Sequence, residues 1–209
     1  MEVTHLGHSC FKLRGKGVTL LIDPFSEEIG LKMPKMTADA VLVTHKHADH
    51  HDLSKVSEYR VLVEGPGEYE IGGAQIFGIS AFHDSSGGKE RGKITIYHIK
   101  MDGLTIVHLG DLGEKLNDKQ IEELDGVDIL MIPVGGVFTI DAAKAAEVVA
   151  QLEPKIVIPM HYFVPGLKYN LSPVTNFLKE MGKEGIKPQP KLVITKEKLL
   201  EETELVVLE

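Results

Sequence analysis

The order of apolar segments along the 209 residues predicts an α/β protein with two mixed sheets packed face to face and helices outside. The first half of the chain reads as successive strands, whereas the second half alternates strands with helices. The chain is long enough to bury a substantial core, and it has no repeat, low-complexity tract or long linker. We therefore expect one domain over residues 1–209, although periodicity alone leaves other α/β arrangements open.

Short apolar runs bounded by turn residues predict the strands of the first half. Gly15-Lys16-Gly17 joins two of these runs and is typical of a hairpin. Asp23-Pro24 ends the third strand. The predicted strands are residues 3–6, 11–13, 18–22, 40–43, 60–63, 75–79 and 94–99.

Helical periodicity and capping residues predict three helices in the second half, at residues 118–124, 141–152 and 172–181. The expected N-caps are Asn117 or Asp118 for the first, Asp141 or Thr139 for the second, and Ser172, followed by Pro173, for the third. The predicted strands of this half are residues 104–109, 129–132, 156–160, 192–194 and 204–208.

The composition disfavours several kinds of protein. Hydrophobic residues make up 43% and charged residues 26% of the chain, which is typical of a globular protein. No run approaches the ~18 apolar residues that a membrane helix needs, and no secretory signal is visible. Cys10 is the only cysteine, which suits a reducing cytosol, so we expect a cytoplasmic protein. The net charge of −8 disfavours long nucleic acids as partners.

A histidine-rich segment follows the predicted strand 40–43. Residues 44–51 read Thr-His-Lys-His-Ala-Asp-His-His, so three histidines and an aspartate fall within six residues, at His45, His47, Asp49 and His50. In an extended segment alternate side chains face one side, and the first three of these can converge. Imidazole and carboxylate ligands suit zinc, and less specifically iron or manganese. A structural zinc site is the main rival, but such sites usually use cysteine thiolates.

Three further candidate ligands stand at the ends of other predicted strands. His83 follows strand 75–79, Asp111 follows strand 104–109, and His161 follows strand 156–160. Each alone is weak evidence, because a histidine at a strand end is often structural. His108 alternates onto the face opposite Asp111, so we expect it to pack rather than to bind metal. Together with the histidine-rich segment, the three residues predict a two-metal site.

This pattern resembles the metallo-β-lactamase superfamily over essentially the whole chain. The matching residues are Asp23 after an early strand, His-x-His-x-Asp-His at 45–50, and then His83, Asp111 and His161. The resemblance implies the family's four-layer αββα sandwich, with the site at one edge of the two sheets. It implies that His45, His47 and His83 hold a first metal, that Asp49, His50 and His161 hold a second, and that Asp111 bridges both. Asp23 would orient the ligand segment through hydrogen bonds.

Within the superfamily, the opening Thr-His-Leu-Gly-His-Ser-Cys-Phe and the run Asp23-Pro24-Phe25 resemble the branch that contains ascorbate-6-phosphate lactonase. Other branches fit less well. Secreted β-lactamases usually carry cysteine where Asp111 stands, and type II glyoxalases add a helical C-terminal domain. Flavodiiron proteins carry glutamate where His47 stands, and the RNA-processing nucleases insert a long cap or arm.

The resemblance implies a hydrolase that attacks an ester, lactone or phosphoester of a small molecule with a metal-bridging hydroxide. Its cofactors would be two divalent metal ions, zinc first and manganese or iron as alternatives. Asp49 would orient the nucleophile and accept its proton. Two alternatives stay open: a metal-dependent phosphodiesterase or nuclease, and a non-catalytic metal-binding module.

Three more polar residues could line the substrate cleft. His8 lies in a Gly-His-Ser turn, where it could equally make a structural hydrogen bond. Arg91 ends the polar run Gly-Gly-Lys-Glu-Arg, which reads either as a mobile loop at the mouth of the site or as a hairpin tip. Tyr162 could donate to a developing oxyanion or simply pack. The sequence leaves the oligomeric state open.

Overall fold

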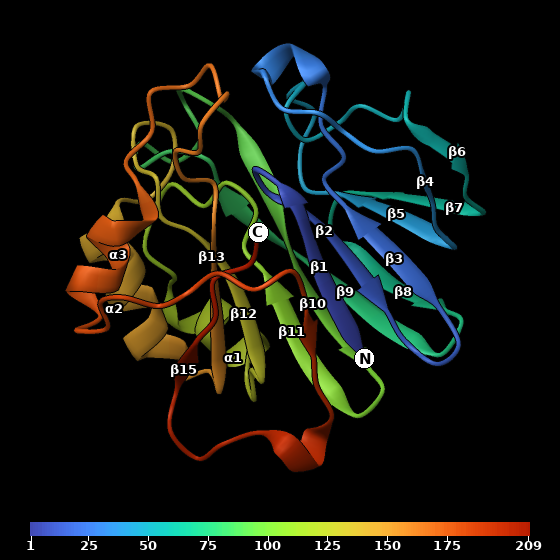
Figure 1. Ribbon diagram of the computed structural model, residues 1–209. Coiled ribbons are helices and arrows are strands. Elements are labelled where there is room, and N and C mark those ends of the chain that lie inside the picture. Colours follow the sequence, from blue (N-terminus) through green and yellow to red (C-terminus); the bar gives the residue numbers. More distant parts are fainter.

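The computed structural model describes residues 1–209 and is built on two large β-sheets packed face to face (Figure 1). The six-stranded sheet has the order β14 (Leu192–Val193), β1 (Glu2–Gly7), β2 (Cys10–Arg14), β3 (Thr19–Ile22), β5 (Ala40–Val43), β7 (Val61–Glu64). The seven-stranded sheet has the order β15 (Glu204–Leu205), β13 (Ile156–Met160), β12 (Ile129–Pro133), β11 (Leu104–His108), β10 (Lys93–Met101), β9 (Ala74–Phe82), β8 (Gly67–Ile71). Both sheets mix parallel and antiparallel pairs, which confirms the predicted sandwich.

The main core lies between the sheets and consists mainly of buried apolar side chains. Phe11 and Leu42 of the six-stranded sheet belong to the same core cluster as Ile106 of the seven-stranded sheet. Tyr97 of β10 crosses this core, and its hydroxyl oxygen lies 2.8 Å from the carbonyl oxygen of Val43. A polar atom inside the core is therefore paired with backbone, and it ties one sheet to the other.

Three helices cover the outer face of the seven-stranded sheet, at α1 (Asp118–Glu123), α2 (Ala142–Leu152) and α3 (Val174–Glu180) (Figure 1). Val148 of α2 and Phe177 of α3 pack in one apolar cluster with Leu130 of β12. The outer face of the six-stranded sheet has no α-helix. It is covered by the short 3-10 helix η1 (Glu27–Ile29) and by loop residues such as Leu167. A separate small sheet pairs β4 (Met36–Thr37) with β6 (Val56–Glu58), and η2 (Lys196–Lys198) lies near the C-terminus.

Local details differ from the predictions where tertiary contacts decide. Strand β8 was not predicted, because its Gly-Glu-Tyr-Glu-Ile sequence is polar and it lies at the sheet edge, largely exposed. Ser172 does not cap α3, which has Pro173 as its N-cap residue. The backbone N–H of Ser172 instead donates to Gly135, 2.9 Å away, so Ser172 is held outside the helix. Asn117 and Asp141 do cap α1 and α2.

The strand directions bring many carboxyl ends to one edge of the sandwich. Strands β1, β3 and β5 run in the same direction in one sheet, as do β9, β11 and β13 in the other. The residues that follow these six strands are therefore neighbours, although they are spread over about 150 residues of sequence. No helix is long and apolar enough to cross a membrane.

Candidate metal centre

Every predicted metal-ligand candidate lies at this edge, in three overlapping groups. The ligand atoms within each group lie within 4.8 Å of one another. The groups are His45, His47 and His83; His8, Asp49, His50 and His161; and His45, His50 and Asp111. The first group contains the three residues expected at the first metal. The second contains the three expected at the second metal, with His8 in addition.

The carboxylate of Asp111 lies at the centre of the three groups. Oδ1 is 3.2 Å from Nε2 of His50, while Oδ2 is 3.3 Å from Nε2 of His161 and 3.4 Å from Nε2 of His83. Nε2 of His45 is 4.0 Å from Oδ2. One carboxylate thus faces imidazoles of both predicted metal positions, and the Asp111 side chain is only 2% exposed.

Asp23 fixes the orientation of two of these imidazoles. Its carboxylate accepts hydrogen bonds from the backbone N–H and the hydroxyl of Thr44, both at 2.7 Å, and from Nδ1 of His50 at 2.8 Å. Because the Thr44 hydroxyl donates to Asp23, it accepts from Nδ1 of His45 at 3.0 Å. Both rings therefore carry a proton on Nδ1, and in their neutral form they present the lone pair of Nε2 to the centre.

Several buried atoms in the centre lack a hydrogen-bond partner, namely Nε2 of His45 and His50, both ring nitrogens of His161, and Oδ1 of Asp111. An unsatisfied buried polar atom costs about 1–3 kcal/mol, so such a concentration in one cluster needs a physical reason. When His50 is neutral, as a metal ligand must be, its Nε2 and Oδ1 of Asp111 face each other as two acceptors 3.2 Å apart. A cation between these atoms removes the conflict, so the residues present fit divalent metal ions.

The pKa values reflect the same arrangement. Burial and the neighbouring His50 lower the pKa of His45 to about 3, so its imidazole is neutral and can act as a ligand. Burial by itself would lower the pKa of His50, but the carboxylates of Asp111 and Asp23 raise it well above its usual value. In the metal-free protein a proton on His50 thus offsets part of the negative charge that a cation would offset.

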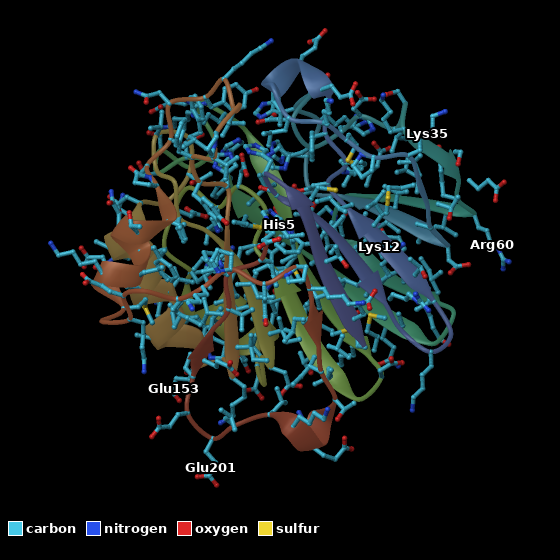
Figure 2. All side chains as sticks on the ribbon, viewed as in Figure 1. His5, Lys12, Lys35, Arg60, Glu153 and Glu201 are labelled. Atoms are coloured by element: carbon cyan, nitrogen blue, oxygen red, sulfur yellow. The ribbon has the colours of Figure 1, made fainter.

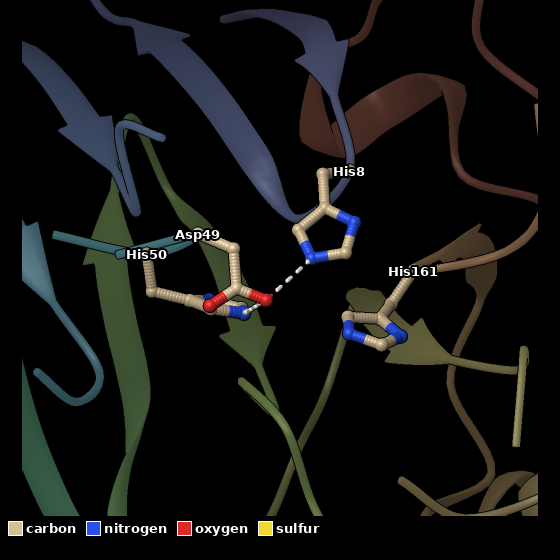
Figure 3. Close-up of side chains that lie close together, drawn as sticks. All are labelled: His8, Asp49, His50 and His161. Carbon is tan, nitrogen blue, oxygen red and sulfur yellow. Dashed lines mark hydrogen bonds and ion pairs between the residues drawn. The ribbon is translucent and has the colours of Figure 1, made fainter. Parts of the chain in front are cut away.

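His8 joins the second group from the turn between β1 and β2. Its Nε2 lies 3.2 Å from Oδ2 of Asp49, and its ring centroid lies 4.2 Å from that of His161 (Figure 3). The carbonyl oxygen of His8 accepts hydrogen bonds from Nε2 of His5 at 3.0 Å and from the backbone N–H of His161 at 2.9 Å. The turn is therefore fixed to the end of β13, and His8 is a largely buried member of the cluster that also lines a pocket together with Tyr162.

Three residues of this centre have left-handed backbone conformations that non-glycine residues rarely adopt. Their φ angles are 54° at His8, 48° at Asp23 and 52° at His161. Such conformations cost about 1–2 kcal/mol each and persist where surrounding contacts demand them. In all three cases the residue directly follows a strand (β1, β3 or β13), and its side chain belongs to the cluster or bonds to one of its members.

The other two cleft candidates are placed differently. Arg91 lines a pocket together with His45 and His47, and its Cζ lies 4.6 Å from the centroid of the Phe138 ring. The hydroxyl of Tyr162 donates to the carbonyl of Leu208 at 3.5 Å, and the ring packs in the apolar cluster beneath the helices. Its hydroxyl is thus occupied by the C-terminal segment. As predicted, His108 packs in the interior, and it belongs to none of the three ligand groups. Its Nε2 donates a hydrogen bond to the carbonyl oxygen of Ser9 over 2.9 Å.

Two residues near the centre were not predicted. Tyr169 has its ring 5.9 Å from that of His8, and burial together with the nearby carboxylates of Asp49 and Asp111 raises its pKa. Asp84 accepts four backbone hydrogen bonds from the loop that leads to Arg91. For Asp84, its position directly after His83 and before a Ser-Ser-Gly-Gly run was an available signal. For Tyr169 the sequence offers none.

Two facing mixed sheets with a histidine and aspartate cluster at one edge that could hold metal ions define the class of metal-binding proteins with this sandwich fold. The particular family follows from comparison: residues 2–161 match the β-lactamase superfamily domain, and the chain belongs to that superfamily. This result confirms the predicted superfamily and fold.

Curated relatives and solved structures agree with the assignment. The chain is 32% identical to a UPF0173 metal-dependent hydrolase of Carboxydothermus hydrogenoformans, covering 78% of this chain and 84% of the relative. A similar hydrolase of Thermococcus kodakarensis is 33% identical with the same coverage. A Thermotoga maritima structure assigned to the Zn-dependent hydrolases of the metallo-β-lactamase superfamily is 37% identical, with a TM-score of 0.81 over 99% of this chain and 97% of that chain. The resemblance to the ascorbate-6-phosphate lactonase branch stays a prediction.

Proposed function

We propose that this metal-dependent hydrolase uses two divalent metal ions, held as the resemblance implies. His45, His47 and His83 would hold the first, and Asp49, His50 and His161 the second, with Asp111 shared between them. The observation that carries this proposal is the Asp111 carboxylate, which lies 3.2 to 4.0 Å from imidazole nitrogens of both sets. Zinc suits the imidazole-rich donor set, with manganese or iron as alternatives.

Divalent ions in this centre supply Lewis-acid activation of water and of the electrophilic group of the substrate. Asp49 is the residue that handles the proton of the attacking water. Its side chain is 14% exposed, whereas those of Asp111 and Asp23 are 2% and 0% exposed, so it is the carboxylate of the centre that can exchange a proton with solvent. Burial would raise the pKa of Asp49, but the hydrogen bond from His8 holds it below its usual range. Asp49 is therefore ionised and able to accept a proton.

His8 and Asp23 are positioning residues in this proposal. His8 fixes one oxygen of Asp49, and Asp23 fixes the rings of His50 and, through Thr44, of His45. Such partners hold ligands at the required rotamer, and losing one typically lowers metal affinity 10- to 100-fold.

The substrate we propose is a small molecule with an ester, lactone or phosphoester bond. His45 and His47 line a pocket of about 630 Å³, which is the size range of small-molecule sites. The chain's net charge of −8 gives no general attraction for long nucleic acids.

The test combines metal analysis with an activity screen. Protein stripped with a chelator is reloaded with zinc, manganese or iron(II), and its metal content is compared with hydrolysis of 4-nitrophenyl esters, lactones and phosphoesters. We expect two metals per chain and hydrolysis that disappears on chelation and returns on reloading. A maximum metal content near zero, or hydrolysis insensitive to chelation, would contradict the proposal.

A further inference from the structure

We infer that the substrate carries an oxyanion group, a carboxylate or a phosphate, which the guanidinium of Arg91 binds beside the metal centre. This inference rests on the proposed function, because it concerns the substrate of that centre. It comes from four features of the structure: a pocket, its charge, the aromatic support of Arg91, and the loop that carries Arg91.

The pocket lies between the two sheets and opens onto the candidate first metal position. It is lined by residues 43–47 at the end of β5, by residues 64–66 at the end of β7, by residues 91–95 at the start of β10, and by Ser80 of β9. His45 and His47 belong to this lining. A substrate whose scissile group sits at the metal centre can therefore extend into this pocket.

The pocket is basic, although the protein as a whole carries a net charge of −8. Lys46, Arg91 and Lys93 line it, and Glu64 is its only acidic residue. Glu64 already faces two partners, Nζ of Lys46 at 3.8 Å and Nε2 of His51 at 3.2 Å. Arg91 and Lys93 form no ion pair. Two cationic side chains are thus free to meet a negative group that enters the pocket.

Aromatic side chains hold Arg91 at this position. Its guanidinium stacks on Phe138, with Cζ 4.6 Å from the ring centroid. Phe138 in turn packs edge-on against Tyr169, whose ring is 5.9 Å from that of His8. Stacking leaves the edge of the planar guanidinium available for two parallel hydrogen bonds, the geometry that matches a carboxylate or phosphate. Because the side chain is held before binding, less conformational entropy is lost when the anion binds.

Asp84 fixes the loop that ends at Arg91. Its carboxylate accepts backbone hydrogen bonds from Ser86 at 2.8 Å, Gly88 at 3.0 Å, Glu90 at 3.1 Å and Arg91 at 2.8 Å. These bonds favour a defined loop over the mobile loop considered from sequence. Since Asp84 directly follows His83, the same loop joins the candidate metal ligand to Arg91, and Asp84 is the positioning residue for Arg91.

A purely structural Arg91, present only to cover Phe138, is the rival interpretation, and substitutions can separate the two. Arg91→Met keeps an unbranched apolar side chain over Phe138 but removes the charge, whereas Arg91→Lys keeps the charge. Arg60→Met is the matched control, because Arg60 is an exposed arginine just before β7, far from the centre (Figure 2).

The activity arm uses three 4-nitrophenyl esters: the neutral butanoate, the carboxylate-bearing glutarate monoester and the phosphonate-bearing 3-phosphonopropanoate. We expect Arg91→Met to lower kcat/KM for a negatively charged ester at least about tenfold more than for the neutral one, the usual scale for a lost charge-assisted hydrogen bond. Arg91→Lys should restore part of this preference, and Arg60→Met should leave all three rates unchanged. The charged ester whose kcat/KM falls more in Arg91→Met identifies the preferred oxyanion.

A binding arm keeps this inference separate from the proposed function. Metal-free wild-type protein and the same variants are titrated with glutarate and with inorganic phosphate, and binding is followed by NMR chemical shifts. Arg91→Met should weaken binding of at least one anion, while Arg60→Met should not. If no ester is hydrolysed, the proposed ester hydrolysis is contradicted, and the binding measurements alone test whether Arg91 binds an oxyanion. Equal effects of Arg91→Met on charged and neutral esters, or unchanged anion binding, would overturn the inference.

Discussion

His50 donates a hydrogen bond from Nδ1 to the carboxylate of Asp23 over 2.8 Å, and both side chains are fully buried. The same carboxylate accepts two bonds from Thr44, whose hydroxyl orients His45. One buried aspartate therefore sets the direction of two imidazoles that belong to different candidate metal positions. This relationship makes the centre sensitive to a residue that would not itself touch a metal.

Asp23→Asn should weaken binding at both metal positions. The amide nitrogen replaces either Oδ2, which accepts from Nδ1 of His50 and from the Thr44 hydroxyl, or Oδ1, which accepts from the Thr44 backbone N–H, so at least one buried bond is lost. We expect metal affinity to fall about 10- to 100-fold and the free energy of unfolding of the metal-free protein to fall by about 2–4 kcal/mol. Competition with a chelator and chemical denaturation measure the two effects. Asp118→Asn, on the exposed first turn of α1, is the control, and equal behaviour of both variants would contradict the role of Asp23.

His161→Ala should reduce metal occupancy of the second position far more than that of the first. His161 belongs to the group of Asp49 and His50 and not to the group of His47. Anomalous scattering from crystals of the metal-loaded variant measures the two occupancies separately. His108→Ala is the matched control and should keep both metals, although losing its bond to Ser9 lowers stability. Equal loss of both metals in His161→Ala would contradict the assignment.

Asp49→Asn should lower hydrolysis by at least ~10²-fold, the usual scale for a lost proton-transfer group. The amide cannot accept the proton of the attacking water, and it also weakens the second metal position. Rates are therefore measured at metal concentrations that saturate the variant, with metal content checked in parallel. Asp52→Asn, three residues away and outside the three ligand groups, should retain wild-type rates. A saturated Asp49→Asn variant with normal turnover would refute the role of Asp49.

The metal-free protein should lose stability as the pH falls from about 6.5 toward 4.5. Burial, with the nearby His161, lowers the pKa of His8 to about 4, and burial with His50 lowers that of His45 to about 3. In this window the unfolded chain binds protons that the folded chain does not. Each of the two histidines therefore lowers the free energy of unfolding by about 1.4 kcal/mol for each unit by which the pH falls.

Protonation of His50 has the opposite effect on the stability of the fold, and it does so at higher pH. Its pKa is raised, so the folded chain keeps a proton that the unfolded chain loses above about pH 6.5, and stability also falls on that side. The free energy of unfolding, measured by denaturant titration with a chelator present, should therefore be greatest near pH 6.5. His8→Gln should flatten the acidic side of this curve. Stability that stays constant or rises from pH 6.5 to 4.5 would contradict these shifts.

Much of the fold was predictable because its strands carry strong local patterns. Strands β5 and β13 begin and end at the predicted residues, since each is a continuous buried apolar run bounded by polar or turn residues. The polar edge strand β8 was missed because its contribution lies in backbone pairing with β9, which leaves no apolar pattern. The predicted helical layer on the six-stranded sheet is reduced to η1 and loops.

The sequence by itself determined the histidine-rich segment, the three later ligand candidates and the superfamily, because these depend on residue types at strand ends. The tertiary structure alone decided that His8 joins Asp49, that Tyr162 faces the C-terminal segment, and that Phe138 supports Arg91. These pairs are separated by 41, 46 and 47 residues. Contacts at such separations depend on how the two sheets and their loops pack in three dimensions, and no local periodicity in the chain encodes that packing.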